Sequence, residues 1–133
     1  RWTLTRKIIQ RNGDVFAFMG EAEFSWLEGS EHEESRALAY FENGEVTAPN
    51  GHVMPAERRY FWQQLQTGLF EVLFDDKRYF HSFSATNPNA EHLCGDDNYV
   101  VRYDFSTWPV WRSTWKVIGP RKDYTMISKY SPA

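Results

Sequence analysis

Alternation of apolar and polar side chains with a period of two is the feature that most constrains this chain. From Phe16 to Trp26, apolar or small residues occupy every second position, and Glu21, Glu23 and Ser25 lie between them. Because successive side chains of a β-strand point to opposite faces of a sheet, this pattern predicts a strand with one buried face. Gly20, in the middle of this strand, is typical of a strand that bends or approaches another backbone closely.

Similar short segments follow one another along the whole chain. Turn signals separate them about every 8–12 residues, and no stretch of about ten residues predicts a helix. The pattern favours an all-β fold, with one domain spanning residues 1–133. We predict a single closed, up-and-down antiparallel β-barrel of about 8–10 strands. The predicted turns lie at 12–14, 28–30, 43–44, 49–51, 67–68, 75–77 and 108–109.

Aromatic residues are the informative excess in the composition. They make up 17% of the chain, with six Trp, seven Tyr and ten Phe. Aromatic side chains favour strands and fill wide cores or pockets. A tight interior of this size does not need so many, so we expect part of the barrel interior to form a pocket.

The charge pattern excludes some partners. The net charge is −3 and basic residues are interleaved with acidic ones, so we expect no nucleic-acid partner. No apolar run approaches the ~18 residues of a membrane span, and the first ten residues do not resemble a signal peptide. A single cysteine, Cys94, excludes an internal disulfide and fits a reducing compartment. We therefore expect a soluble, cytoplasmic monomer or homodimer without a membrane partner.

Two motifs stand out in the last third of the chain. One is Glu91-His92-Leu93-Cys94-Gly95-x-Asp97-x-Tyr99 followed by Tyr103-x-Phe105, and the other is Gly119-Pro120-Arg121-Lys122-Asp123-Tyr124. Together with the opening Arg1-Trp2 and with Arg59-Tyr60-x-Trp62, they resemble a family of uncharacterised small proteins that is assigned only as a domain of unknown function. The resemblance covers nearly the whole chain and implies no specific activity.

The predicted architecture also resembles the calycin group, which includes lipocalins, fatty-acid-binding proteins and nitrobindin-like barrels. This resemblance implies a cup-shaped barrel with an apolar interior. It also implies that Trp2 is the tryptophan of the first strand, and that Arg112 or Arg121 packs over it.

Alternation from Leu93 places Asp97 on a mostly apolar face with Tyr99 and Tyr103. A carboxylate inside a barrel needs a cation or hydrogen-bond donors. Arg58 is the most attractive partner, because its own face also carries aromatic residues. Alternatively, Asp97 caps backbone amides in a surface turn. The predicted ligand-binding residues are Arg58, Tyr60, Trp62, His81, Asp97, Tyr99, Tyr103, Lys122 and Tyr124.

Lys122 and Asp123 follow the corner at Gly119-Pro120. A lysine and an aspartate near a barrel mouth can bind an anion or transfer protons. The alternative is a salt bridge that joins neighbouring strands.

Histidine and cysteine side chains offer two further hypotheses. His92 and Cys94 share a strand face, so the thiol could be an activated nucleophile, but a buried, inert cysteine is the simpler explanation. His81 is predicted to point inward with Tyr79 and Phe83. It could ligate haem iron, as in nitrobindin-like barrels, or be a hydrogen-bonded core histidine. We predict no metal site, and the sequence identifies no cofactor.

Three functions remain open. The first is the binding of a small hydrophobic or anionic ligand inside the barrel, which requires a cavity of about 300 Å³ or more. The second is a small enzyme with an acid–base site at the barrel mouth, using Asp97, Tyr99, Lys122 and His81. The third is a protein-interaction module with an exposed patch formed by Trp108, Trp111 and Trp115.

Overall fold

The computed structural model describes residues 1–27, 36–66, 68–84, 87–94 and 96–133. These residues form ten strands and no helix. The described residues therefore contain no helix that is long and apolar enough to cross a membrane. The strands are β1 (Trp2–Gln10), β2 (Val15–Trp26), β3 (Arg36–Thr47), β4 (Val53–Gln66), β5 (Leu69–Phe74), β6 (Tyr79–Ser84), β7 (Asn89–Cys94), β8 (Asp97–Asp104), β9 (Trp111–Gly119) and β10 (Lys122–Pro132).

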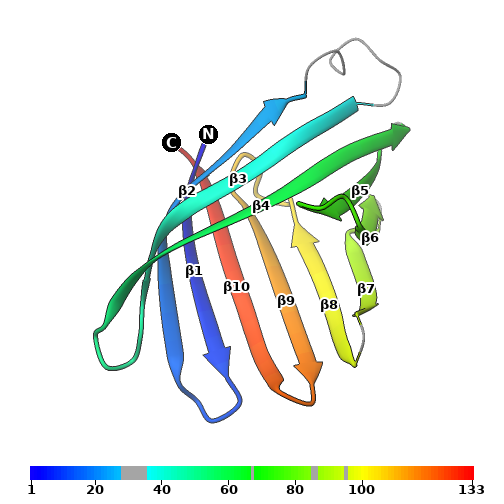
Figure 1. The fold of residues 1–133 in the computed structure, drawn as a ribbon. Coiled ribbons are helices and arrows are strands. Elements are labelled where there is room, and N and C mark those ends of the chain that lie inside the picture. Colours follow the sequence, from blue (N-terminus) through cyan, green and yellow to red (C-terminus); the bar gives the residue numbers. More distant parts are fainter. Residues whose placement is uncertain (28–35, 67, 85–86, 95) are drawn as a thin grey trace.

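All ten strands belong to one antiparallel sheet that curls into a nearly closed barrel (Figure 1). The order of the strands is β6-β5-β4-β3-β2-β1-β10-β9-β8-β7, so the first and last strands pair in the middle of the sheet. The edge strands β6 and β7 contact each other, but no ladder joins them among the described residues. The predicted all-β, up-and-down barrel is confirmed.

Two glycines face each other where the long strands β2 and β3 bend. Gly20 pairs with Gly44, and a Cβ atom on Gly20 would lie 2.1 Å from the carbonyl oxygen of Asn43. A Cβ atom on Gly44 would lie 2.2 Å from the carbonyl oxygen of Met19. The two backbones therefore approach more closely than any side chain permits, and this contact allows the sheet to coil.

The predicted turn at Asn43-Gly44 was wrong. β3 continues through both residues to Thr47, and the chain reverses at Ala48–Gly51, where the Gly51 amide donates to the Ala48 carbonyl at 2.9 Å. Pairing with β2 and β4 on both sides overrides the local turn signal. The predicted turns at 12–14, 49–51 and 75–77 are confirmed, whereas 28–30 lies outside the described residues.

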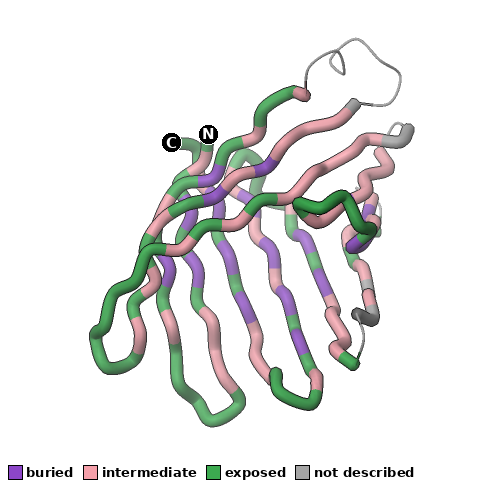
Figure 2. Tube along the Cα trace, viewed as in Figure 1, coloured by how far each residue is buried: buried purple, intermediate pink, exposed green. Residues whose placement is uncertain are grey.

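The core follows the alternation of each strand. Buried residues lie along the middle of the strands and the hairpin turns are exposed (Figure 2). On β8, the predicted inner residues Val101 and Tyr103 are buried. The buried apolar residues are Leu4, Phe18, Ala22, Tyr40, Val72, Phe80, Phe83, Val101, Tyr103, Trp111, Trp115, Val117, Met126 and Tyr130.

A β-bulge changes the faces of β6. Val72 pairs with His81 and Leu73 pairs with Tyr79, so Phe80 is an extra residue in the ladder. As a result Phe80 and His81 are both buried, and Tyr79 is half exposed. The prediction that Tyr79 shares the inner face of His81 was therefore wrong.

Candidate functional site: an aromatic cup and a polar chamber

A cavity of about 420 Å³ lies at the barrel end that holds both chain termini. We call it the aromatic cup. Every lining residue except Leu38 is aromatic, and the volume falls in the range of small-molecule sites, about 300–1,000 Å³. The lining residues are Trp2, Phe24, Leu38, Trp62, Phe70, Phe83, Phe105, Trp108 and Trp111.

Contacts between rings hold the walls of the cup in place. Trp2 meets Trp108 edge to face with ring centroids 5.4 Å apart, and Trp62 meets Phe83 in the same way at 5.4 Å. Trp111 stacks on Tyr130 at 3.7 Å with the rings nearly parallel. Such contacts fix ring orientation as well as burying area. The cup is therefore preorganised by its own aromatic residues.

Only one of the three clustered tryptophans is exposed. Trp108 is 61% exposed at the rim of the cup, whereas Trp111 and Trp115 are buried. The contiguous exposed patch that the interaction-module hypothesis requires is thus not formed by these residues.

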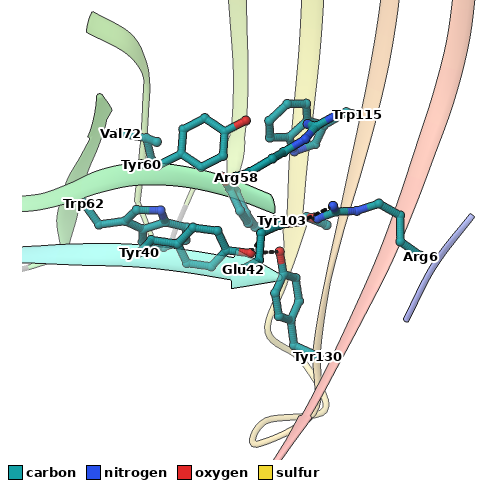
Figure 3. A pocket seen from close by; sticks show the side chains of 11 residues that line it. Arg6, Tyr40, Glu42, Arg58, Tyr60, Trp62, Val72, Tyr103, Trp115 and Tyr130 are labelled. Carbon is teal, nitrogen blue, oxygen red and sulfur yellow. Dashed lines mark hydrogen bonds and ion pairs between the residues drawn. The ribbon is translucent and has the colours of Figure 1, made fainter. Parts of the chain in front are cut away.

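Deeper in the barrel lies a second cavity of about 20 Å³, which has room for about one water molecule (Figure 3). We call it the polar chamber. Trp62 lines both the chamber and the cup. The chamber is lined by Arg6, Tyr40, Glu42, Arg58, Tyr60, Trp62, Val72, Tyr103, Ser113, Trp115 and Tyr130.

A buried ion pair forms one side of the polar chamber. Both terminal nitrogens of Arg6 donate to the Glu42 carboxylate, and Arg6 Nε donates to Ser128 Oγ at 2.7 Å. The Tyr40 hydroxyl donates to Glu42 Oε1 at 2.7 Å and lies 2.9 Å from the Tyr130 hydroxyl. Hydrogen bonds thus surround both buried charges, as their burial requires.

Arg6 stays charged despite its burial. Loss of water lowers the pKa of its guanidinium, but interaction with Tyr130 and the hydrogen bonds and charge of Glu42 raise it, so the net pKa is above the ordinary value. Sequence analysis did not predict this ion pair. The one signal was a charge at Arg6 on the same strand face as Leu4, which is fully buried.

Arg58 also lines the polar chamber. It is the cross-strand neighbour of Glu42, and its guanidinium carbon lies 5.9 Å from the ring centroid of Trp115. Burial raises the pKa of the Tyr60 hydroxyl, and the charge of Arg58 opposes that rise. The predicted placement of Arg58, Tyr60 and Trp62 on one inner face of β4 is confirmed.

The predicted pairing of Asp97 with Arg58 was wrong. Asp97 Oδ2 instead accepts a hydrogen bond from Lys122 Nζ at 3.1 Å. The register explains this: Asp97 begins β8 beside the β9–β10 hairpin, and its Oδ1 atom lies 1.9 Å from the position that a Cβ atom on Gly119 would take. Lys122 does form a salt bridge, as the alternative prediction had it, but its partner is on β8, which β9 separates from β10 in the sheet.

Tyr99 completes this cluster at the barrel end opposite the cup. Lys122 Nζ lies 3.4 Å from the Tyr99 hydroxyl, to which it donates. The hydrogen bonds to Asp97 and then to Tyr99 raise the pKa of Lys122. The lysine therefore remains protonated at neutral pH and is unsuited to act as a base. Tyr124 is half-buried nearby, and burial raises the pKa of its hydroxyl.

His81 is a core residue. It is fully buried, and its Nε2 atom lies 2.8 Å from the Tyr103 hydroxyl. Burial, with a contribution from His92, lowers its pKa to about 3, so the ring is neutral. His81 lines neither the cup nor the chamber, and an iron ligand must face a cavity that holds the haem. His81 therefore fits the hydrogen-bonded core histidine and does not fit a haem ligand.

His92 packs edge-on against Phe80, with centroids 5.6 Å apart. The side chain of Cys94 lies outside the described residues, so the predicted thiol–imidazole pair stays a prediction. Within the described part of the chain, no three His, Cys, Asp or Glu side chains are grouped as metal ligands would be.

The chain belongs to a family of unknown function (DUF6314), whose family model matches residues 1–132. This agrees with the motif-based resemblance to a domain of unknown function. Comparisons with curated proteins and with solved structures found no match. The resemblance to calycins is consistent with the nearly closed barrel and stays a prediction.

Proposed function

Because membership of a family of unknown function assigns no activity, we propose from the geometry that the protein binds a small, flat, apolar molecule in the aromatic cup. The observation that carries the proposal is a cavity of about 420 Å³ whose lining is aromatic except for Leu38. The hypothesis of ligand binding required a cavity of about 300 Å³ or more, and the aromatic cup exceeds this volume.

The lining also restricts the class of ligand. Ring faces and edges attract apolar and aromatic surfaces, but they cannot replace the hydrogen bonds that a polar group makes with water. A ligand of the cup must therefore be apolar over most of its surface. Because the rings already contact one another, binding does not require a large rearrangement of the walls.

An uncharged fluorescent probe tests this proposal. Titration of the protein with N-phenylnaphthylamine should give saturable binding with enhanced probe emission. Leu38→Trp should weaken binding by about tenfold or more, because overfilling a packed site costs about 1–3 kcal/mol. Ile127→Trp is the matched control, since this residue is 42% exposed outside the cup. Equal binding by both variants would contradict the proposal.

Native mass spectrometry of the freshly purified protein provides an independent test. A mass that is lost on denaturation identifies a ligand retained from the cell, and the proposal expects an apolar compound. Leu38→Trp should carry less of that compound than Ile127→Trp. A retained polar compound, present equally in both variants, would count against binding in the cup.

The enzyme hypothesis gains no comparable support. Asp97, Tyr99 and Lys122 do come together, but they lie at the end opposite the cup and satisfy one another. His81 is held elsewhere by Tyr103. We therefore propose no reaction for this protein.

A further inference from the structure

The charges around the polar chamber do not balance. Arg6, Arg58 and Glu42 line it, so two cations and one anion give a net charge of +1. Glu42 is fully engaged, because it accepts hydrogen bonds from both terminal nitrogens of Arg6 and from the Tyr40 hydroxyl. The excess positive charge therefore resides on Arg58.

Arg58 has no acidic partner among the described residues. Glu42 is its neighbour across the β3–β4 ladder, but the ion pair of Glu42 is with Arg6. Asp97, the other acidic residue predicted to face inward, pairs with Lys122. A guanidinium that is partly removed from water without a counter-charge attracts an anion more strongly than an exposed one does.

Hydrogen-bond donors around Arg58 suit an anion. A guanidinium carries five N–H donors, and Arg58 and Tyr60 line the same chamber. The Tyr60 hydroxyl can also donate its hydrogen to an acceptor in the chamber. The Trp115 ring, 5.9 Å from the guanidinium carbon, supports the plane of the group. The donors therefore converge from Arg58 and Tyr60.

We propose that the polar chamber binds a compact monovalent anion, a halide or a carboxylate group, on the guanidinium of Arg58 and the hydroxyl of Tyr60. The volume of about 20 Å³ restricts the occupant to a group close to the size of a water molecule. The carboxylate has two sources: a separate small anion, or an acidic group on the ligand of the aromatic cup, because Trp62 lines both cavities.

Chloride NMR measures this site directly. Exchange of chloride with a protein site broadens its resonance, and acetate should reverse the broadening by competition. Arg58→Gln should remove most of the broadening that acetate reverses. Arg59→Gln is the matched control: it removes the same charge from the next residue, which is exposed on the outer face and lies 4.2 Å over the Phe41 ring. Equal broadening in the two variants would overturn the proposal.

A second variant keeps the test decisive if Arg58→Gln does not fold. Tyr60→Phe deletes only the hydroxyl and should weaken both chloride binding and acetate competition. Unchanged binding in Tyr60→Phe, with Arg58→Gln either unfolded or unchanged, would exclude the site as proposed.

Two naphthalene dyes distinguish the sources of the anion. Naphthoate carries a carboxylate group, and N-phenylnaphthylamine carries no charge. If the anion belongs to the ligand of the cup, only naphthoate should displace chloride. If the anion is separate, neither dye should displace it. The uncharged dye tests the cup alone, so its failure to bind would contradict the proposed function and leave the anion site standing.

Discussion

Removal of the Glu42 charge is the perturbation whose effect on stability follows most directly from the structure. The Glu42 side chain is 2% exposed and that of its partner Arg6 is 4% exposed. In Glu42→Gln, Arg6 would keep its hydrogen bond to Ser128 but would lose its counter-charge. Breaking a buried pair in this way costs about 3–5 kcal/mol, out of a total of about 5–15 kcal/mol for a domain.

Equilibrium unfolding in urea, followed by tryptophan fluorescence, gives the free energy of unfolding. We expect Glu42→Gln to lower the midpoint without changing the slope. The double variant Arg6→Met, Glu42→Leu should recover most of the loss, because it leaves no uncompensated charge in the interior. Its stability should exceed that of Glu42→Gln.

Glu21→Gln serves as the control for charge removal at the surface. Glu21 lies 3.8 Å from Arg1, and both side chains are more than half exposed, so the expected loss is about 0–1 kcal/mol. The reasoning is refuted if Glu42→Gln costs no more than Glu21→Gln. It is also refuted if the double variant loses as much stability as Arg6→Met and Glu42→Leu lose together when each is measured alone, because the two residues would then act independently.

Three further predictions concern other parts of the barrel. Gly20→Ala should cost about 3 kcal/mol or more in thermal unfolding, because its Cβ atom would overlap the β3 backbone, whereas Gly13→Ala, at φ +93° with open space around it, should cost only about 1–2 kcal/mol. The pKa of His81 is about 3 in the folded state and about 6.5 when unfolded, so stability should fall by up to about 1.4 kcal/mol per pH unit as pH drops from 6.5 toward 3. His81→Phe should lack that part of the slope in urea midpoints measured against pH, and an unchanged slope would show that His81 is not its source. Lys122→Met should cost less than about 1 kcal/mol in urea, since the lysine is 44% exposed, and a larger loss would mean that its ion pair is a structural anchor.

Alternation predicted the strands because each strand has one buried face. It placed Tyr60 and Trp62 inside on β4, and Val101 and Tyr103 inside on β8, as the structure has them. A period of two is a local property, so it is visible without knowledge of which strands pair.

The sites depend on register, which no local pattern contains. Arg6 and Glu42 are 36 residues apart, and they meet because β1, β2 and β3 pair at particular offsets. Gly44 carries a turn signal, but its closeness to Gly20 keeps it within a strand. The bulge at Phe80 likewise has no signal in the sequence, although it decides which side chains of β6 face the core.

The aromatic cup could not be predicted as a unit for the same reason. Its lining residues come from strands and a loop spread over the whole chain, with one or two side chains from each. The aromatic excess indicated a pocket, but the sequence-based set of site residues shares only Trp62 with the lining of the cup.

The opening of the sheet between β6 and β7 means that this chain must bring distant segments together when it folds. β1 and β10 pair in the middle of the sheet, although they are the first and last strands in the sequence. Arg6 therefore bonds to Ser128, which is 122 residues away. Residues 1 and 133 already meet there, where the Ala133 amide donates to the Arg1 carbonyl at 3.3 Å. A circular permutant joined at these residues and opened between 84 and 87 would run from β7 through β10 and β1 to β6, which is the spatial order of the sheet. Every ladder would then close through a short connection, with less loop entropy lost before pairing, so the rearranged chain should fold faster to the same barrel.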